Sequence, residues 1–159
     1  MVTDKQLSWD RYFLEMAVYV GSRSSCLTRK VGCVLTKDNR VLATGYCGTP
    51  SGMTNCNDGG CQRCQDRIDG KIKSGEERDR CWCLCAEQNV IAHCALYGIN
   101  PEDSTIYLPI MPCINCALLL ISCKMGRIVS MGGLDMGSNE LLKESNIEVY
   151  VTDNVLQGA

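Results

Sequence analysis

The sequence contains a single histidine, His93, among its 159 residues. Metal sites that need two or more imidazoles are therefore excluded. Aromatic residues make up only 6% of the chain, the formal charge is −2, and no run of five or six basic residues occurs. Because binding to a long nucleic acid depends on a concentrated positive surface, we expect no polynucleotide partner.

Long apolar runs are also absent. No window of the sequence approaches the roughly 20 apolar residues that a membrane-spanning helix needs. The first residues, MVTDKQLSWDRYF, lack the charged start and apolar centre of a signal peptide. We therefore expect a cytoplasmic protein with no membrane partner, in a compartment where clustered thiols serve metal binding or catalysis more often than disulfides.

Cysteine, in contrast, is abundant, with 13 residues, and the odd number also disfavours a complete disulfide scaffold. The apolar content of 45% and the length suit one soluble domain over residues 1–159. We expect residues 153–159 to form a short tail.

The succession of helical and extended patterns predicts an α/β fold. Apolar spacing predicts a helix over residues 8–22, and the runs 31–36 and 40–46 predict a β-hairpin. Further helices are expected over 86–98, 112–126 and 138–145, alternating with strands over 104–109, 127–131 and 147–152. This order indicates a three-layer α/β/α sandwich around a central five-stranded mixed sheet.

Residues 47–82 show no periodic pattern and are rich in Gly, Cys, Asn and charged residues. We expect a long irregular loop there, inserted before the helix that starts at residue 86. Loops of this length are usually functional or held in place by something other than an apolar core.

Two cysteine motifs stand at the starts of predicted helices: Cys85-Ala86-Glu87 and Pro112-Cys113-Ile114-Asn115-Cys116. Cys113 and Cys116, three residues apart, share a helix face and can chelate one ion. Helix N-termini stabilise thiolates. Three sulfurs would leave one position of a tetrahedral zinc ion open, as in catalytic rather than structural zinc sites.

Glu87 supplies the other half of the expected chemistry. Zinc lowers the pKa of a bound water to about 7, and a carboxylate two residues after Cys85 would lie beside that water as a general acid and base. The pattern matches the signature of zinc nucleobase deaminases. We expect His93 to be a helix-face residue rather than a ligand. A lone C-x-x-C is often only a structural zinc half-site, so an inactive, zinc-stabilised binding module is the non-enzyme alternative.

At this point the chain resembles the deoxycytidylate (dCMP) deaminase family of the cytidine deaminase-like superfamily, from about Trp9 to Thr152. The resemblance rests on the motifs SWDRYF, RSSC, VGCVL, GYCGTPSG, CAEQN and PCINC. It implies hydrolysis of dCMP to dUMP and ammonia, with Glu87 as the catalytic residue. The implied catalytic zinc ligands are Cys85, Cys113 and Cys116. The resemblance further implies a homo-oligomer, a hexamer in the family, activated by dCTP and inhibited by dTTP, with Mg²⁺ accompanying the triphosphates.

The sequence departs from the family pattern at three places. Cys85 replaces the usual histidine ligand, and a third thiolate by itself makes a zinc-bound water less acidic. Cys47 replaces an asparagine amide suited to the sugar, and the loop with Leu134 and Asp135 lacks an aromatic and a basic residue. A deaminase of another cytosine nucleotide or nucleoside is therefore the alternative enzyme. The expected substrate-binding residues are Arg23, Ser24, Thr28, Cys47 and Ala86, with Arg29 and Lys30 as further phosphate contacts.

The resemblance also implies a second, structural zinc ion that would hold the long loop. Its ligands by position are Cys26, Cys56, Cys61 and Cys81. Cys64 and Cys83 compete for these places, because C-x-x-C and C-x-C spacings both permit chelation; free loop thiols are the alternative. We expect Cys33, Cys94 and Cys123 to be small buried apolar residues.

Overall fold

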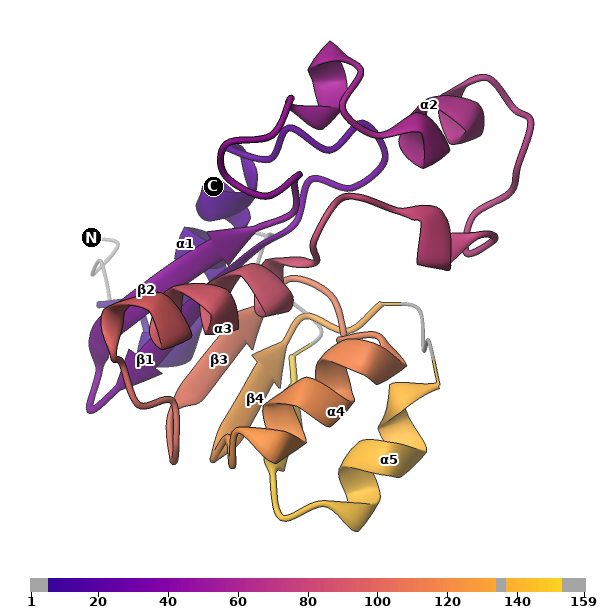
Figure 1. The fold of residues 1–159 in the computed structure, drawn as a ribbon. Helices are drawn as coiled ribbons and strands as arrows, with labels where there is room; N and C mark the ends of the chain where they lie inside the picture. Colours follow the sequence, from indigo (N-terminus) through magenta and orange to yellow (C-terminus); the bar gives the residue numbers. More distant parts are fainter. Residues whose placement is uncertain (1–5, 134–136, 153–159) are drawn as a thin grey trace, which may run out of the picture.

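A five-stranded mixed sheet runs through the molecule in the order β2-β1-β3-β4-β5 (Figure 1). The computed structural model describes residues 6–133 and 137–152. The strands are β1 Gly32–Lys37, β2 Arg40–Tyr46, β3 Thr105–Leu108, β4 Arg127–Ser130 and β5 Glu148–Val151. β1 is antiparallel to both β2 and β3, whereas β3, β4 and β5 are parallel. The predicted hairpin and the predicted mixed sheet are confirmed.

Helices cover both faces of this sheet. They are α1 Trp9–Gly21 on one face, and α3 Ala86–Tyr97, α4 Ile114–Ser122 and α5 Ser138–Glu144 on the other. Successive side chains of a strand point to opposite faces, so Val34 packs with Phe13 of α1 while its neighbours Cys33 and Leu35 join the core under α3 and α4. The predicted three-layer α/β/α arrangement is therefore confirmed.

The segment between β2 and α3 is not wholly irregular, as the sequence had suggested. It contains the short helices η1 Cys56–Asp58, α2 Gln62–Ile68 and η2 Arg78–Arg80, which lie beyond one end of the sheet (Figure 1). The buried residues of α2 are Arg63 and Cys64. Because neither gives the apolar repeat that marks a helix in a sequence, hydrophobic periodicity could not predict α2. The expected tail, 153–159, lies outside the described residues.

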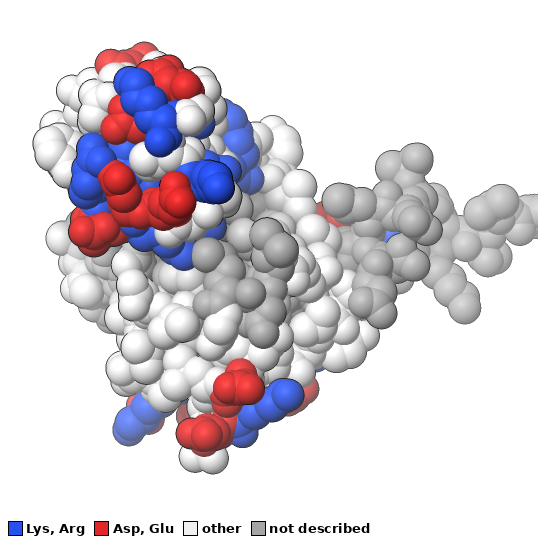
Figure 2. Space-filling view, turned by 90° about the vertical axis from the view of Figure 1, so that its right-hand side faces the viewer, with Lys and Arg blue, Asp and Glu red and all other residues white. Residues whose placement is uncertain are grey.

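The surface over α2 and η2 carries charges of both signs. Figure 2 shows Lys, Arg, Asp and Glu gathered there at the top of the molecule. Lys71 pairs with Asp66 and Asp69, and Arg80 pairs with Asp66 and Glu77. Surface pairs of this kind contribute little stability, so they do not explain how the segment is held. Within the described ranges, no helix is both long enough and apolar enough to cross a membrane.

Asp10 joins α1 to the sheet. Arg127 of β4 donates to both of its carboxylate oxygens, at 2.8 and 3.0 Å, and the Tyr107 hydroxyl donates to one of them at 3.0 Å. The hydrogen bonds from Arg127 are the main reason that the pKa of Asp10 is lowered from 3.8. A lowered carboxyl pKa stabilises the folded state in full above the unfolded value, and this stabilisation is lost as the pH falls through the folded value.

We therefore expect Asp10→Asn to lower the free energy of unfolding by about 1.5–3 kcal/mol at pH 7, the contribution typical of hydrogen bonds to a charged group. Urea unfolding measures this difference. The gap between wild type and variant should close as the pH falls below 3.8, the ordinary value for Asp10. Asp38→Asn, in the exposed turn after β1, is the control. Equal stability of the two variants would contradict the expectation.

Candidate active site

The N-terminal ends of α3 and α4 meet on one face of the sheet. Cys85 is the N-cap of α3, Cys113 is the N-cap of α4, and Cys116 lies in the first turn of α4. The three Sγ atoms all lie within 4.8 Å of one another. The structure thus brings together the three cysteines that the sequence predicts as ligands of a catalytic zinc ion.

Close contact between β2 and α3 fixes one of these helix ends. A Cβ atom on Gly45 would lie 2.4 Å from the carbonyl oxygen of Ala86, so only glycine permits this approach. The Asn89 amide donates to the carbonyl oxygen of Tyr46 at 2.9 Å, and the Cys33 thiol donates to that of Ala86 at 3.3 Å. Ala86, expected to contact the substrate, is fully buried in this contact.

Glu87 lies in the first turn of α3 and is only 6% exposed. Burial is the main cause that raises its pKa to about 7, and the nearby Cys113 charge raises it further. The side chain shares a small cavity with Cys85 and Cys113. A carboxyl group with a pKa near neutrality can both accept and release a proton, which is what a general acid and base must do.

The three thiols at the helix ends form one hydrogen-bonded group. Hydrogen bonds from Cys116 and Cys85 lower the pKa of Cys113, and the same interaction with Cys113 raises the pKa of Cys85 to about 12. The Arg78 guanidinium donates to the Cys85 sulfur at 3.8 Å. Zinc–sulfur bonds of about 2.3 Å put the sulfurs of a tetrahedral site about 3.8 Å apart. Three thiols this close, at two helix N-termini, therefore fit a zinc ion with one open position.

A cavity of about 290 Å³ adjoins Cys85 and Cys113. Thr28 and Cys47, both expected to contact the substrate, line it. Its arginines are Arg29, Arg63 and Arg78. Arg63 and Arg78 were not among the expected site residues, because they stand in the aperiodic segment and nothing in their spacing marks them. One acidic residue, Asp79, also lines the cavity. Because the arginines outnumber it, the cavity is suited to an anionic substrate group.

The other expected phosphate contacts line a different cavity, of about 710 Å³, whose walls include Arg23, Lys30 and the exposed His93. Ser24 also lines it, although its hydroxyl lies 2.9 Å from the carbonyl oxygen of Arg29 and 2.6 Å from that of Cys47. Ser24 therefore positions residues of the first cavity. Leu134 and Asp135, the residues of the third departure from the family pattern, lie outside the described residues.

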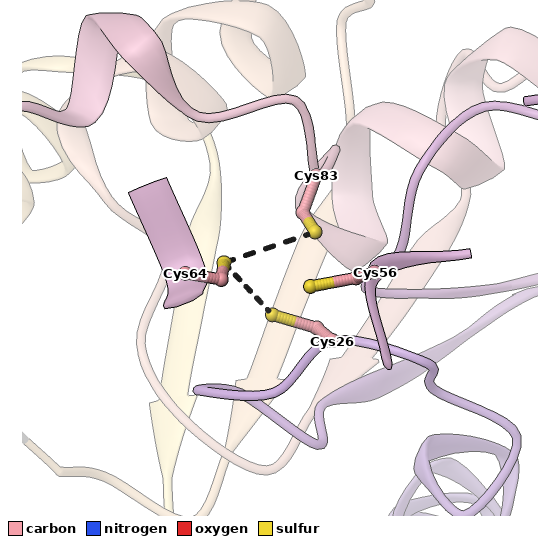
Figure 3. Close-up of side chains that lie close together, drawn as sticks. All are labelled: Cys26, Cys56, Cys64 and Cys83. Atoms are coloured by element: carbon pink, nitrogen blue, oxygen red, sulfur yellow. Dashed lines mark hydrogen bonds between the residues drawn. The ribbon is translucent and has the colours of Figure 1, made fainter. Parts of the chain in front are cut away.

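Further cysteines gather beside this cavity. Cys26, Cys56, Cys64 and Cys83 point toward one another from four segments of the chain (Figure 3), with their Sγ atoms within 4.8 Å. A second group with the same limit is Cys61, Cys64, Cys81 and Cys83. The expected set of Cys26, Cys56, Cys61 and Cys81 does not come together as one group. Spacing along the chain could not rank Cys64 and Cys83 above their neighbours, because the turn of α2 and the path of residues 81–85 decide it.

The cysteines outside these groups differ in burial. Cys33 and Cys94 are buried, as expected, whereas Cys123, the C-cap of α4, is only half-buried. His93 belongs to none of the three potential ligand groups found among the described residues, and its ring lies 6.2 Å from that of Tyr97. This placement agrees with a helix-face residue.

Comparisons with known proteins fit this geometry. Residues 7–131 match the family described as the cytidine and deoxycytidylate deaminase zinc-binding region. The chain is 38% identical over 144 residues to a deoxycytidylate deaminase of Schizosaccharomyces pombe and 36% identical over 146 residues to one of Saccharomyces cerevisiae. Each alignment covers 89% of this chain but only 43% and 44% of those proteins, so the chain spans less than half the length of these two relatives.

The fold is also similar to the crystal structure of dCMP deaminase from the cyanophage S-TIM5 in complex with dCMP and dUMP. The TM-score is 0.72 at 24% identity, over 89% of this chain and 94% of that one. At this identity the likeness shows the fold alone, while the sequence matches extend to the cysteine motifs at both helix ends. The chain therefore belongs to the dCMP deaminase family, within the zinc-binding group of cytidine and deoxycytidylate deaminases.

Proposed function

We propose that this chain is a zinc-dependent hydrolase that converts dCMP to dUMP and ammonia. The observation that carries the proposal is the meeting of three cysteine thiols, Cys85, Cys113 and Cys116, with the buried carboxyl group of Glu87 beside them. A purely structural zinc site has no use for a buried carboxyl group in that place. The sequence similarity to relatives named deoxycytidylate deaminase supports the choice of substrate.

In this proposal Cys85, Cys113 and Cys116 hold the zinc ion. When bound, zinc supplies Lewis acidity that lowers the pKa of a coordinated water toward about 7. Glu87 accepts one proton from the attacking water and delivers it to N3 of cytosine. It then takes the second water-derived proton from the hydroxyl group on C4 and passes it to the exocyclic amine, which leaves as ammonia. Its raised pKa of about 7 suits this alternation between base and acid.

The cavity with the three arginines supports a substrate that carries a phosphate. Because charge-assisted hydrogen bonds from arginine to phosphate are strong and directional, dCMP is favoured over the nucleoside deoxycytidine. Cys47 lines the same cavity, and burial raises the pKa of its thiol to about 12, so it is a neutral neighbour of the sugar. A thiol is a weaker hydrogen-bond partner than an amide, which keeps another cytosine nucleotide as the second candidate.

The experiment that tests the proposal is ammonia release from dCMP, CMP, dCTP and deoxycytidine by the zinc-loaded protein, with and without dCTP as an effector. Turnover of dCMP above the other compounds is the expected result. Turnover of only another cytosine compound would change the assigned substrate but not the assigned reaction. No turnover by protein shown to contain zinc would identify a zinc-stabilised binding module instead.

Arg29→Ala is expected to reduce the preference for dCMP over deoxycytidine, expressed as the ratio of their kcat/KM values, by about 10- to 100-fold. That range corresponds to the contribution of about 1.5–3 kcal/mol from a charged hydrogen bond. The ratio isolates the phosphate, because any effect of Arg29 on Glu87 acts on both substrates. Arg40→Ala, at the exposed start of β2 and in the lining of neither cavity, is the matched control. An unchanged ratio for Arg29→Ala would remove Arg29 from the phosphate site.

Regulation by dCTP and dTTP, with Mg²⁺ accompanying the triphosphates, belongs to the same proposal. The larger cavity supports it, because Arg23 and Lys30 give that cavity positive charge at a distance from the helix ends that carry the thiols. If added dCTP activates dCMP turnover in the wild type but not in Arg23→Ala, the effector is assigned to this cavity.

A homo-oligomer of cytoplasmic chains, and specifically a hexamer, completes the proposal. Exposed aromatic side chains on the outer side of α1 support self-association: Trp9, Tyr12 and Tyr19 are 51%, 44% and 79% exposed. Light scattering coupled to gel filtration measures the state, and a monomer at micromolar concentration would contradict it.

A further inference from the structure

Six cysteines form one cluster beside the substrate cavity. Two sets of four have all their Sγ atoms within 4.8 Å of one another, and the two sets share Cys64 and Cys83. We refer to the union of the two sets as the six-thiol cluster. Its members are Cys26, Cys56, Cys61, Cys64, Cys81 and Cys83.

We propose that the six-thiol cluster binds two zinc ions, with the thiolates of Cys64 and Cys83 bridging both. The remaining ligands of one ion are Cys26 and Cys56, and those of the other are Cys61 and Cys81. Each ion then has four sulfur ligands, and the two tetrahedra share the edge from Cys64 to Cys83. This site is separate from the deamination chemistry and goes beyond a single structural zinc.

The sulfur separations on both sides of the shared edge suit zinc. Tetrahedral zinc with bonds of about 2.3 Å places its sulfurs about 3.8 Å apart. The shared edge from Cys64 to Cys83 measures 4.0 Å, and Cys26 lies 3.8 Å from Cys64 on one side. On the other side, Cys81 lies 4.0 Å from both Cys64 and Cys61. A disulfide would need about 2.05 Å.

Backbone amides support the terminal ligands of both ions. The N–H group of Leu27 donates to the sulfur of Cys56 at 3.4 Å, and that of Trp82 donates to the sulfur of Cys61 at 3.4 Å. Hydrogen bonds of this kind hold metal ligands in place and offset the charge of a thiolate. One such bond is present on each side of the shared edge, so a terminal ligand of each proposed ion has this support.

The second ion adds no net charge. One zinc ion with four thiolates carries a charge of −2, and two zinc ions with six thiolates carry the same −2, because each added thiol releases its proton to solvent. Arg29, Arg63 and Arg78 line the cavity that Cys26, Cys81 and Cys83 also line. Asp79 lines this cavity as well, so arginines outnumber acidic side chains beside the cluster. Because the cluster carries the same charge with one ion or two, electrostatics does not oppose the second ion.

The segment around the cluster needs a core of this kind. Between residues 49 and 83, the buried residues are Cys56, Cys61, Arg63 and Cys64, none of which is an aliphatic or aromatic side chain. A segment of this length without an apolar core requires a metal or another cross-link. A single ion on the first set would leave Cys61, at the start of α2, and Cys81, after η2, without a metal bond.

Native mass spectrometry of the complete, zinc-loaded protein tests the proposal. Three zinc ions per chain are expected, one at the helix ends of α3 and α4 and two in the six-thiol cluster. Two ions per chain would overturn the proposal, as would a mass deficit that shows disulfides among the six cysteines. Cadmium-113 NMR of the protein in which cadmium has replaced zinc gives an independent count. Three signals are expected, and two of them should be coupled to each other through the shared sulfur atoms. Absence of that coupling would show that Cys64 and Cys83 do not bridge two ions.

Variants locate the second ion. The double variant with Cys61→Ser and Cys81→Ser is expected to retain two zinc ions, one fewer than the wild type. If the cluster held a single ion on the other four cysteines, the wild type and the double variant would contain the same number of zinc ions. Cys123→Ser, outside all three ligand groups, should retain three. If the double variant does not fold, the wild-type ion count and the cadmium coupling decide the question without it. None of these counts depends on turnover, so they test the cluster independently of the proposed deaminase activity.

Discussion

Replacing Glu87 with glutamine is expected to lower kcat for dCMP deamination by about 10²- to 10⁴-fold, the usual contribution of general acid–base catalysis. Glutamine keeps the size of the side chain but cannot accept and return a proton. Glu87 is buried beside Cys85 and Cys113 and contributes none of the sulfur atoms that would hold the metal. The variant should therefore keep the zinc content of the wild type while losing turnover.

Steady-state kinetics and metal analysis on the same samples measure both quantities. Glu102→Gln, at an exposed carboxylate that pairs with Lys124, is the matched control and should keep full activity. Retained activity in Glu87→Gln would mean that another group moves the proton. Loss of zinc together with activity would mean that Glu87 supports the metal site rather than the proton transfer.

Stripping zinc from the six-thiol cluster is expected to have the second large effect, unfolding of residues 49–83. Zinc binding contributes about 10–16 kcal/mol in small domains whose fold depends on the metal, and this segment has little else to hold it. After treatment with a strong chelator, trypsin should cleave at Lys71, Lys73, Arg78 and Arg80. Peptide mapping over time, with and without chelator, measures the change.

The helix-end zinc is removed by the same treatment, so a variant must separate the two effects. Cys116→Ser lacks one of the three thiols at the helix ends and keeps every member of the six-thiol cluster. Without chelator it should resist trypsin at residues 49–83 as the wild type does. Cleavage within this segment in untreated Cys116→Ser, or no change in wild type on chelation, would show that the cluster metal does not hold the segment.

Most of the fold follows from local patterns in the sequence. The apolar spacing of α1, the β-branched runs of β1 and β2 and the stop at Gly98 are local signals, and all appear in the structure where they were expected. α2 is different, because its buried side chains are Arg63 and Cys64. Such a helix is stabilised by contacts outside itself, which periodicity does not record.

The candidate site divides in the same way. The C-A-E and P-C-x-x-C motifs place their thiols and carboxyl group at helix N-termini by short-range spacing. That Cys85 meets Cys113 and Cys116 was predicted from the likeness of the two motifs to a known signature, because spacing within each motif does not bring two helices together. Arg63 and Arg78 reach the same cavity only because α2 and η2 fold back beside it. Contacts between residues far apart in the chain depend on the path of the whole backbone, and no local pattern encodes that path.

The remaining cysteines show the limit most clearly. The sequence determined that the protein has more thiols than one catalytic zinc ion can bind. It also showed that many of them lie in a segment with too few apolar side chains to form a hydrophobic core of its own. It could not choose among Cys61, Cys64, Cys81 and Cys83, because each is two or three residues from a rival with the same chelating ability. Only the tertiary structure decided this, by placing Cys64 and Cys83 within 4.8 Å of both pairs of partners. The physical reason is that a metal site requires sulfur atoms to converge in space, and convergence across 57 residues, from Cys26 to Cys83, is a property of the folded chain.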